Sequence, residues 1–149
     1  MIKLTKSHYD KEDGMSFVKI TTDLGCFDGY AFLNPEDKEI ASKYLGCEIA
    51  ELRAHIEYFK KRKYIINQRL TALKGLRKKF KKYISTNMDY ADSIMDSTLI
   101  NILNQQIAEL ERSRNLCKQS IKDINKYIDT AIDERLEFLE KIEKRKQDN

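Results

Sequence analysis

The chain has 149 residues, of which 35% are charged, with one Pro, five Gly and no Trp. That length suits about one domain, and no apolar run approaches the length of a membrane span. The three cysteines, Cys26, Cys47 and Cys117, are widely spaced and form no CxxC pair, which argues against a disulfide framework and a zinc site. No apolar signal segment follows Met1, so we expect a reduced, cytoplasmic compartment.

The net charge of +4 is unevenly distributed along the chain. Residues 1–51 carry six basic and ten acidic residues, a net charge of −4. Residues 52–84 carry twelve basic residues against Glu57 alone, a net charge of +11. Residues 85–149 carry ten basic and thirteen acidic residues, a net charge of −3. Such segregation indicates a charged interaction, either within the molecule or with a partner.

The beginning of the chain predicts a β-hairpin. Residues 16–22 and 26–32 are rich in β-branched and aromatic residues, and Asp23-Leu24-Gly25 joins them. Two such runs with a short Gly-containing connection are typical of a hairpin. Residues 2–5 are a candidate third strand. Because two strands alone are marginally stable in water, we expect the hairpin to lie on an apolar surface.

A short helix is predicted to follow the hairpin. Asn34 can cap free N–H groups, and Pro35 suits the first helical position. The helix is expected to run to about Tyr44 and to end at Gly46, a residue that tolerates the left-handed conformation of a helix end. Residues 1–46 are therefore expected to form a small α+β head.

Two long helices are predicted by apolar residues at alternating spacings of three and four. The first covers residues 48–84 and the second residues 92–146, with a turn at about 85–89. The first ladder is Ile49, Leu52, Ile56, Phe59, Lys63, Ile66, Leu70, Leu73, Arg77, Phe80 and Ile84. The second ladder is Ile100, Leu103, Ile107, Leu110, Arg114, Cys117, Ile121, Ile124, Ile128, Ala131, Arg135, Phe138 and Ile142.

The helices differ in length, at about 55 and 80 Å for 1.5 Å per residue, and a short connection makes them antiparallel. Folding about residue 88 places Ile49 near Lys126 or Tyr127. Roughly the last 18 residues of the second helix then lack a helical partner at this rise per residue. We expect the head to pack on this C-terminal end. The predicted fold is mainly α (α+β), with residues 47–149 as an antiparallel coiled-coil hairpin and the whole chain as one folding unit.

The basic run in the first long helix is the strongest candidate for a functional site. Its cations can neutralise phosphates or contact an acidic protein. Aromatic residues are interleaved with these cations. The alternative is a solvated face whose charge is offset by acidic residues of the facing helix. The predicted partner-binding residues are Lys60, Lys61, Arg62, Lys74, Arg77, Lys78, Lys79, Lys81 and Lys82.

No other constellation indicates chemistry. His8 and His55 are far apart, and the acidic residues of the head lack metal-ligand spacing. No nucleotide-binding, hydrolase or metalloprotease motif occurs. Polar ladder positions such as Lys63 and Arg114, expected at the same level, are typical of residues that set helix register. We therefore expect no enzyme activity, no metal and no cofactor.

Three segments carry a resemblance. They are Thr22-Asp23-Leu24-Gly25-x-Phe27-x-Gly29-x-Ala31, Leu33-x-Pro35-Glu36-Asp37 and Gly46-Cys47-Glu48-Ile49-Ala50-Glu51-x-Arg53-Ala54. Over about residues 15–75 the chain resembles small, uncharacterised accessory proteins encoded by bacteriophages, although its C-terminal helix is longer. The resemblance implies a phage protein in the bacterial cytoplasm that binds and inhibits a host or defence protein, with anti-CRISPR proteins as the most concrete example.

The first functional hypothesis is thus a non-enzymatic inhibitor that binds a host protein or nucleoprotein through the basic helix, as a monomer or homodimer. The alternatives are a nucleic-acid-binding coiled coil and a homo-oligomeric structural protein of the virion, in which residues 129–146 pair with a second copy.

Overall fold

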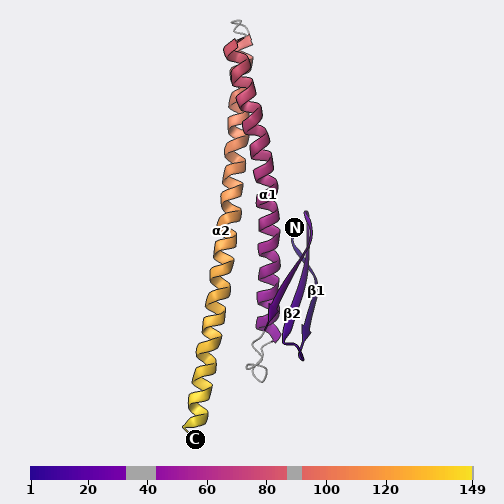
Figure 1. Cartoon of the computed structure of the whole chain (residues 1–149), viewed down its shortest axis with the longest axis vertical. Helices are drawn as coiled ribbons and strands as arrows, with labels where there is room; N and C mark the ends of the chain where they lie inside the picture. Colours follow the sequence, from indigo (N-terminus) through magenta and orange to yellow (C-terminus); the bar gives the residue numbers. More distant parts are fainter. Residues whose placement is uncertain (33–42, 87–91, 149) are drawn as a thin grey trace. The chain divides into compact units, whose positions relative to one another are not determined.

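The computed structural model describes residues 1–32, 43–86 and 92–148, and the side chains of the last segment from residue 97 onward. Its elements are β1 (Lys3–Asp10), β2 (Met15–Thr22), β3 (Gly25–Phe32), α1 (Lys43–Thr86) and α2 (Asp92–Gln147). The described chain is mostly helical, with an N-terminal three-stranded antiparallel sheet and two long helices, as Figure 1 shows.

The contacts divide the chain into two compact units. Unit 1 consists of Met1–Lys61 and Gln119–Asn149, and unit 2 consists of Arg62–Lys118. Each long helix therefore contributes one segment to each unit. The expected division after residue 46, and the expectation of one folding unit, remain predictions.

The predicted hairpin is present as β2 and β3. Their register pairs Thr22 with Gly25, so the connecting loop is Asp23 and Leu24. The Thr22 hydroxyl accepts a hydrogen bond from the Leu24 amide at 3.0 Å and donates one to the Gly25 carbonyl at 3.0 Å. Gly25 has a φ of 114°, which favours glycine at this position. The candidate third strand is also present, and it is longer than predicted because β1 extends to Asp10.

The predicted helix end at Gly46 is wrong, because α1 begins at Lys43 and passes through Gly46 without a break. Gly46 has no positive φ. It is buried against Ser16 of the sheet, and a β-carbon built on it would overlap the Ser16 hydroxyl. The residue therefore permits close packing and does not cap a helix. The predicted helix start at Asn34 lies outside the described residues.

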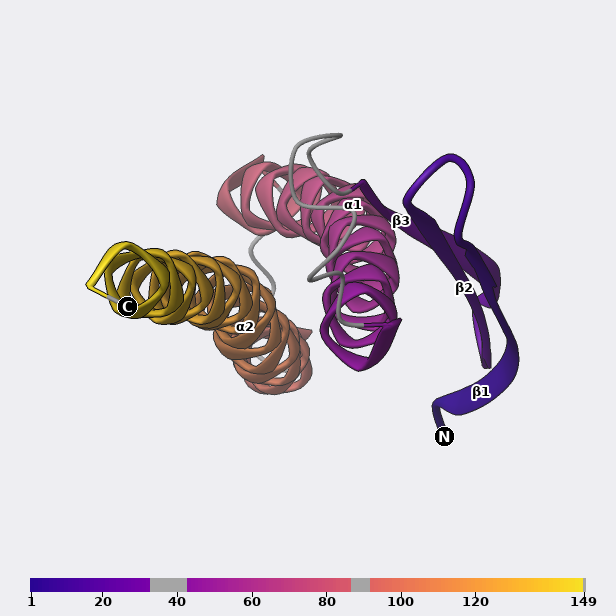
Figure 2. The same ribbon diagram turned by 90° about the horizontal axis from the view of Figure 1, so that it is seen from below.

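The sheet packs on α1 through small residues, and Figure 2 shows the two elements face to face. Gly46, Ala50 and Ala54 recur every four residues, so they lie on one side of the helix. A β-carbon on Gly29 of β3 would overlap the Ala50 carbonyl oxygen and lie 2.6 Å from the Ala54 amide nitrogen. Only glycine at that position allows the observed distance between β3 and the helix.

This contact belongs to the main core of unit 1. Its buried members are Val18, Ile20, Ala31, Ile49, Ala50, Ala54, Ile56, Tyr58 and Ile128. Ile121 and Ile124 of α2 pack against the same core. The Tyr127 hydroxyl donates a hydrogen bond to Glu48 Oε1 at 2.9 Å, which lies within one residue of the level predicted by folding about residue 88. The core thus combines the sheet with one segment of each helix.

Beyond Ile128, α2 contributes no member to that core. Phe138 is 51% exposed, whereas Leu139 is buried. The sheet contacts α1, as the hydrogen bonds from Arg53 to the Tyr30 carbonyl and from Tyr58 to Asp23 show. The expected packing of the head on the C-terminal end of α2 remains a prediction, and residues 33–42 of that head lie outside the described part of the chain.

Unit 2 has a thinner core, made of Ile66, Leu70, Ile107 and Cys117. The ladder positions that the sequence predicts within this unit are all buried or half-buried.

None of the described helices is both long and apolar enough to cross a bilayer.

Candidate binding surface

The nine predicted partner-binding residues all lie on α1, but they fall into different units. Lys60 and Lys61 belong to unit 1, and the other seven belong to unit 2. Within unit 2, Arg62 is about 18 Å along the helix axis from Lys74, at 1.5 Å per residue. The nine cations are therefore not a single local cluster.

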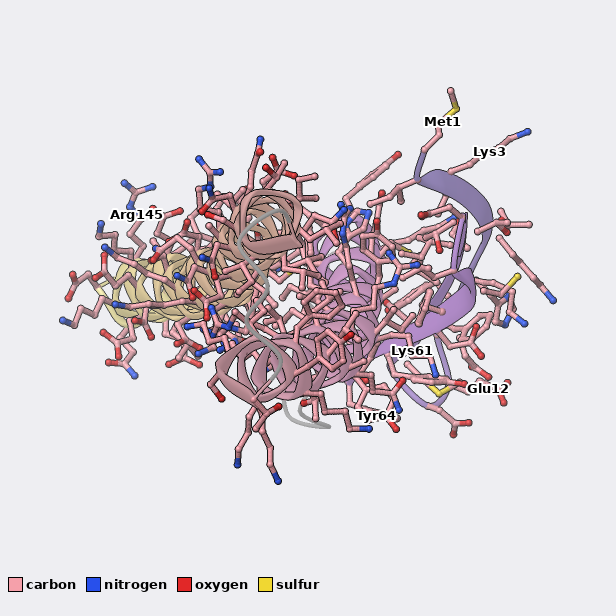
Figure 3. All side chains as sticks on the ribbon, turned by 90° about the horizontal axis from the view of Figure 1, so that it is seen from above. Met1, Lys3, Glu12, Lys61, Tyr64 and Arg145 are labelled. Carbon is pink, nitrogen blue, oxygen red and sulfur yellow. The ribbon has the colours of Figure 1, made fainter. Side chains whose placement is uncertain are left out.

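The N-terminal cations of the set already have interactions within the protein. Lys60 Nζ lies 2.7 Å from Glu57 Oε1 of the same helix, with both side chains more than half exposed. Lys61 and Arg62 each take part in an interaction within the protein, and Figure 3 labels the Lys61 side chain. These residues are consequently weaker candidates for a free binding surface than the sequence suggested.

Lys74 and Arg77 link the two helical segments of unit 2. Lys74 Nζ lies 2.7 Å from Glu111 Oε1, and Arg77 donates a hydrogen bond to Asn104 Oδ1 at 2.9 Å. The hydrogen bond that Lys74 donates has the largest effect and lowers the pKa of the Glu111 carboxyl. The positive charge of Lys74 lowers this pKa further. From Lys74 to Arg77 the residue number rises, whereas from Glu111 to Asn104 it falls, so the two paired segments run antiparallel. Both cations thus contribute to the unit itself.

The remaining four residues, Lys78, Lys79, Lys81 and Lys82, form what we call the lysine cluster. All four are exposed, and within the described residues no ion pair neutralises any of them. Lys78, Lys81 and Lys82 share one side of the helix, since their spacings are three and four, and Lys79 is rotated by about 100° from Lys78. The cluster therefore presents a concentrated positive charge to solvent.

An aromatic pair lies within the cluster. The ring centroids of Phe80 and Tyr83 are 6.4 Å apart. Phe80 occupies a ladder position and is half-buried, whereas Tyr83 is 57% exposed. The packed Phe80 ring supports the exposed Tyr83 ring among the lysines. Sequence interleaving indicated both rings, but only the structure distinguishes the supporting ring from the presented one.

The charge of unit 2 strengthens the field around this cluster. Residues 62–118 carry twelve basic and five acidic residues, a net charge of +7, whereas the rest of the chain carries sixteen basic and nineteen acidic residues, a net charge of −3. A surface of one dominant sign attracts partners of the other sign and accelerates their encounter. Unit 2 is thus suited to an acidic partner.

The polar ladder positions have different surroundings. Arg114 is half-buried, and its Nε has no hydrogen-bond partner among the described residues. Burial raises the pKa of the Cys117 thiol, while the charges of Arg62 and Lys63 act in the opposite direction. Arg135 lies over the Phe138 ring, with its guanidinium carbon 5.5 Å from the ring centroid. Each cation is accommodated differently, which sequence spacing did not reveal.

The described residues contain no group of three or more His, Cys, Asp or Glu side chains placed to hold a metal ion. An open groove of about 490 Å³ in unit 2 is lined by apolar and scattered polar side chains, among them Arg69, Leu73, Gln106 and Glu109. The expectations of no enzyme activity, no metal and no cofactor stay predictions.

Comparison with known proteins gives no further assignment. No protein-family model matches the chain, and neither curated proteins nor solved structures gave a match. The candidate surface is therefore defined by its own geometry and charge.

Proposed function

We propose that this chain is a non-enzymatic binding protein whose lysine cluster contacts an acidic surface on a protein or nucleoprotein. The observation that carries the proposal is the contrast between two groups of cations on α1. Lys74 and Arg77 are engaged by α2, whereas the four cations of the cluster are exposed without an ion pair among the described residues. Like charges spaced three and four residues apart destabilise a helix by a few tenths of a kcal/mol per pair. An acidic partner relieves that repulsion.

The proposed biological setting follows the resemblance to bacteriophage accessory proteins. In that setting the chain acts in the bacterial cytoplasm and blocks a host or defence protein. A CRISPR effector nucleoprotein, of the kind bound by anti-CRISPR proteins, is a partner with the required negative charge. The resemblance of residues 15–75 supports this setting, and the charge of unit 2 supports the chemistry of the contact.

The support for the surface is proposed to be an antiparallel coiled coil. The buried or half-buried ladder positions and the antiparallel contacts Lys74–Glu111 and Arg77–Asn104 agree with such packing in unit 2. A paired helix holds its exposed side chains at fixed positions, which reduces the conformational entropy lost on binding.

A charge-matched pair of variants tests the binding surface. The first replaces Lys78, Lys79, Lys81 and Lys82 with Gln. The control replaces Arg112, Lys118, Lys122 and Lys126 of α2, all exposed, with Gln and so removes the same total charge. Proteins captured from infected or lysogenic cells by the wild type and the control, but lost with the first variant, are the expected partners. Equal capture by both variants, at equal helical content, contradicts the assignment.

Direct nucleic-acid binding is a second candidate, favoured by the exposed Tyr83 ring among the lysines. Aromatic stacking and phosphate neutralisation together bind single strands. This candidate predicts a complex with a single-stranded polynucleotide whose affinity falls linearly with salt on logarithmic axes. If a gel-shift assay at low salt shows no complex, direct nucleic-acid binding is excluded and the acidic protein surface is left as the partner.

A further inference from the structure

The C-terminal segment of α2, residues 129–147, has a broad apolar side on which three large side chains are exposed, although Leu139 on the same side is buried. Ile132, Leu136 and Phe138 are 37%, 49% and 51% exposed. At about 100° per residue, Ile132 and Leu136 lie on one flank, and Phe138 on the other flank, of the stripe formed by Ile128, Leu139 and Ile142. The whole apolar side spans roughly 160° of the helix. A face this wide is typical of a helix that packs against another element.

The charges of this segment are divided by position. Residues 129–140 carry five acidic residues and Arg135, a net charge of −4, and residues 141–146 carry four basic residues and Glu143, a net charge of +3. Lys144, Arg145 and Lys146 occupy the last turn, where cations also favour the helix dipole. The dipole does not account for the acidic run or for Lys141, which lie outside the last turn.

A segment with acidic and basic halves is complementary to itself only when two copies run in opposite directions. A parallel pair would place acidic against acidic and basic against basic residues. An antiparallel pair centred between residues 137 and 138 brings opposite charges to the same level. The pairs are Asp129 with Lys146, Glu134 with Lys141, and Arg135 with Glu140 of the second copy. The same register places Leu136 at the level of Leu139.

From this charge complementarity and the exposed apolar side chains, we propose that residues 129–147 associate with the same segment of a second copy in an antiparallel pair. The pairing buries Ile132, Leu136 and Phe138 and gives the ladder cation Arg135 an acidic neighbour. The inference does not depend on the lysine cluster, which lies in unit 2.

The apolar part of the proposal is tested by replacing Leu136 and Phe138 with Gln in the full chain. The matched control replaces Leu99 and Leu116, which are 42% and 69% exposed elsewhere on α2, with Gln. Sedimentation velocity over a wide concentration range is expected to show a concentration-dependent dimer for the wild type and the control. The first variant should weaken self-association by roughly tenfold or more, because central apolar contacts dominate interface energies.

Circular dichroism checks that both variants keep their helical content. A wild type that remains monomeric at the highest concentration overturns the proposal. Equal self-association of the first variant and the control overturns it as well.

Charge exchange tests the antiparallel direction. One variant carries Asp129→Lys and Glu134→Lys, a second carries Lys141→Glu and Lys146→Glu, and a third combines all four changes. Each of the first two should self-associate more weakly than the wild type, since it carries like charges at the paired levels. The combined variant should recover the wild-type dimer, because the exchanged charges again oppose each other in an antiparallel pair. A combined variant as weak as its parents excludes the antiparallel arrangement.

Discussion

At the scale of single residues, the contact between Gly29 and α1 decides how closely the sheet approaches the helix. Ala50 and Ala54 are fully buried, and the obstacle to a side chain at position 29 is the backbone of the helix itself. Backbone atoms in a helix cannot move aside as a flexible side chain can. The small residues on both sides are therefore a requirement of the packing.

We predict that Gly29→Ala lowers the free energy of unfolding by about 3 kcal/mol, the upper end of the usual cost of overpacking, because the added methyl group meets the helix backbone. Gly75→Ala is the matched control, because nothing lies within 4 Å of a β-carbon there. In a helix interior that change should stabilise the protein by about 0.5–1 kcal/mol. Urea unfolding of both variants measures the difference, and similar effects of the two changes would show that the close approach is absent.

The Lys74–Glu111 pair gives a pH-dependent prediction. The pKa of Glu111 in the folded protein lies below its usual value of 4.5. Its contribution to stability is therefore fully present above pH 4.5 and is lost as the pH falls through the lowered folded pKa. Carbon-detected NMR titration should show that Lys74→Met raises the pKa of Glu111 towards its usual value. Lys79→Met, which changes an exposed cation without an ion pair among the described residues, should leave that pKa unchanged.

At the scale of elements, the hydrophobic ladders predicted which sides of the long helices are covered. Along α1 every ladder position from Ile49 to Ile84 is buried or half-buried. Along α2 the same holds from Ile100 to Arg135, and Phe138 is the exposed exception before Ile142. Periodicity is a reliable guide here because a helix with one apolar side must place that side against another element.

We predict that Ile128→Ala lowers the free energy of unfolding by about 2–4 kcal/mol, the usual cost of a cavity at a buried site. Ile128 is 5% exposed and belongs to the core of unit 1. Leu116→Ala on the same helix is the control, since Leu116 is 69% exposed and exposed changes usually stay within about 0.5 kcal/mol. Equal destabilisation by the two changes in denaturant melts would argue against this core.

At the scale of the whole molecule, the two units differ in the amount of buried apolar surface that each contains. Unit 1 combines a sheet with helical segments around ten buried hydrophobic residues, and unit 2 has four such residues in the described part of the chain. Local opening requires less free energy where fewer apolar contacts are lost.

Hydrogen exchange should therefore distinguish segments of one continuous helix. We predict slower amide exchange in residues 49–59 of α1 than in residues 66–80 after correction for intrinsic rates, because the former segment contributes to the larger core. Mass spectrometry of peptides from the native protein measures both segments in the same sample. Uniform protection along α1 would indicate that the two units open together.

The sequence by itself determined the hairpin, the two long helices and the covered side of each helix, because local turn chemistry and hydrophobic periodicity depend on residues close together in the chain. Only the tertiary structure showed that Gly46 lies inside a helix and that Gly29 meets the helix backbone. It also separated engaged cations such as Lys74 from the exposed lysine cluster. Those distinctions depend on which distant side chains come within a few ångströms, and spacing along one helix does not contain that information.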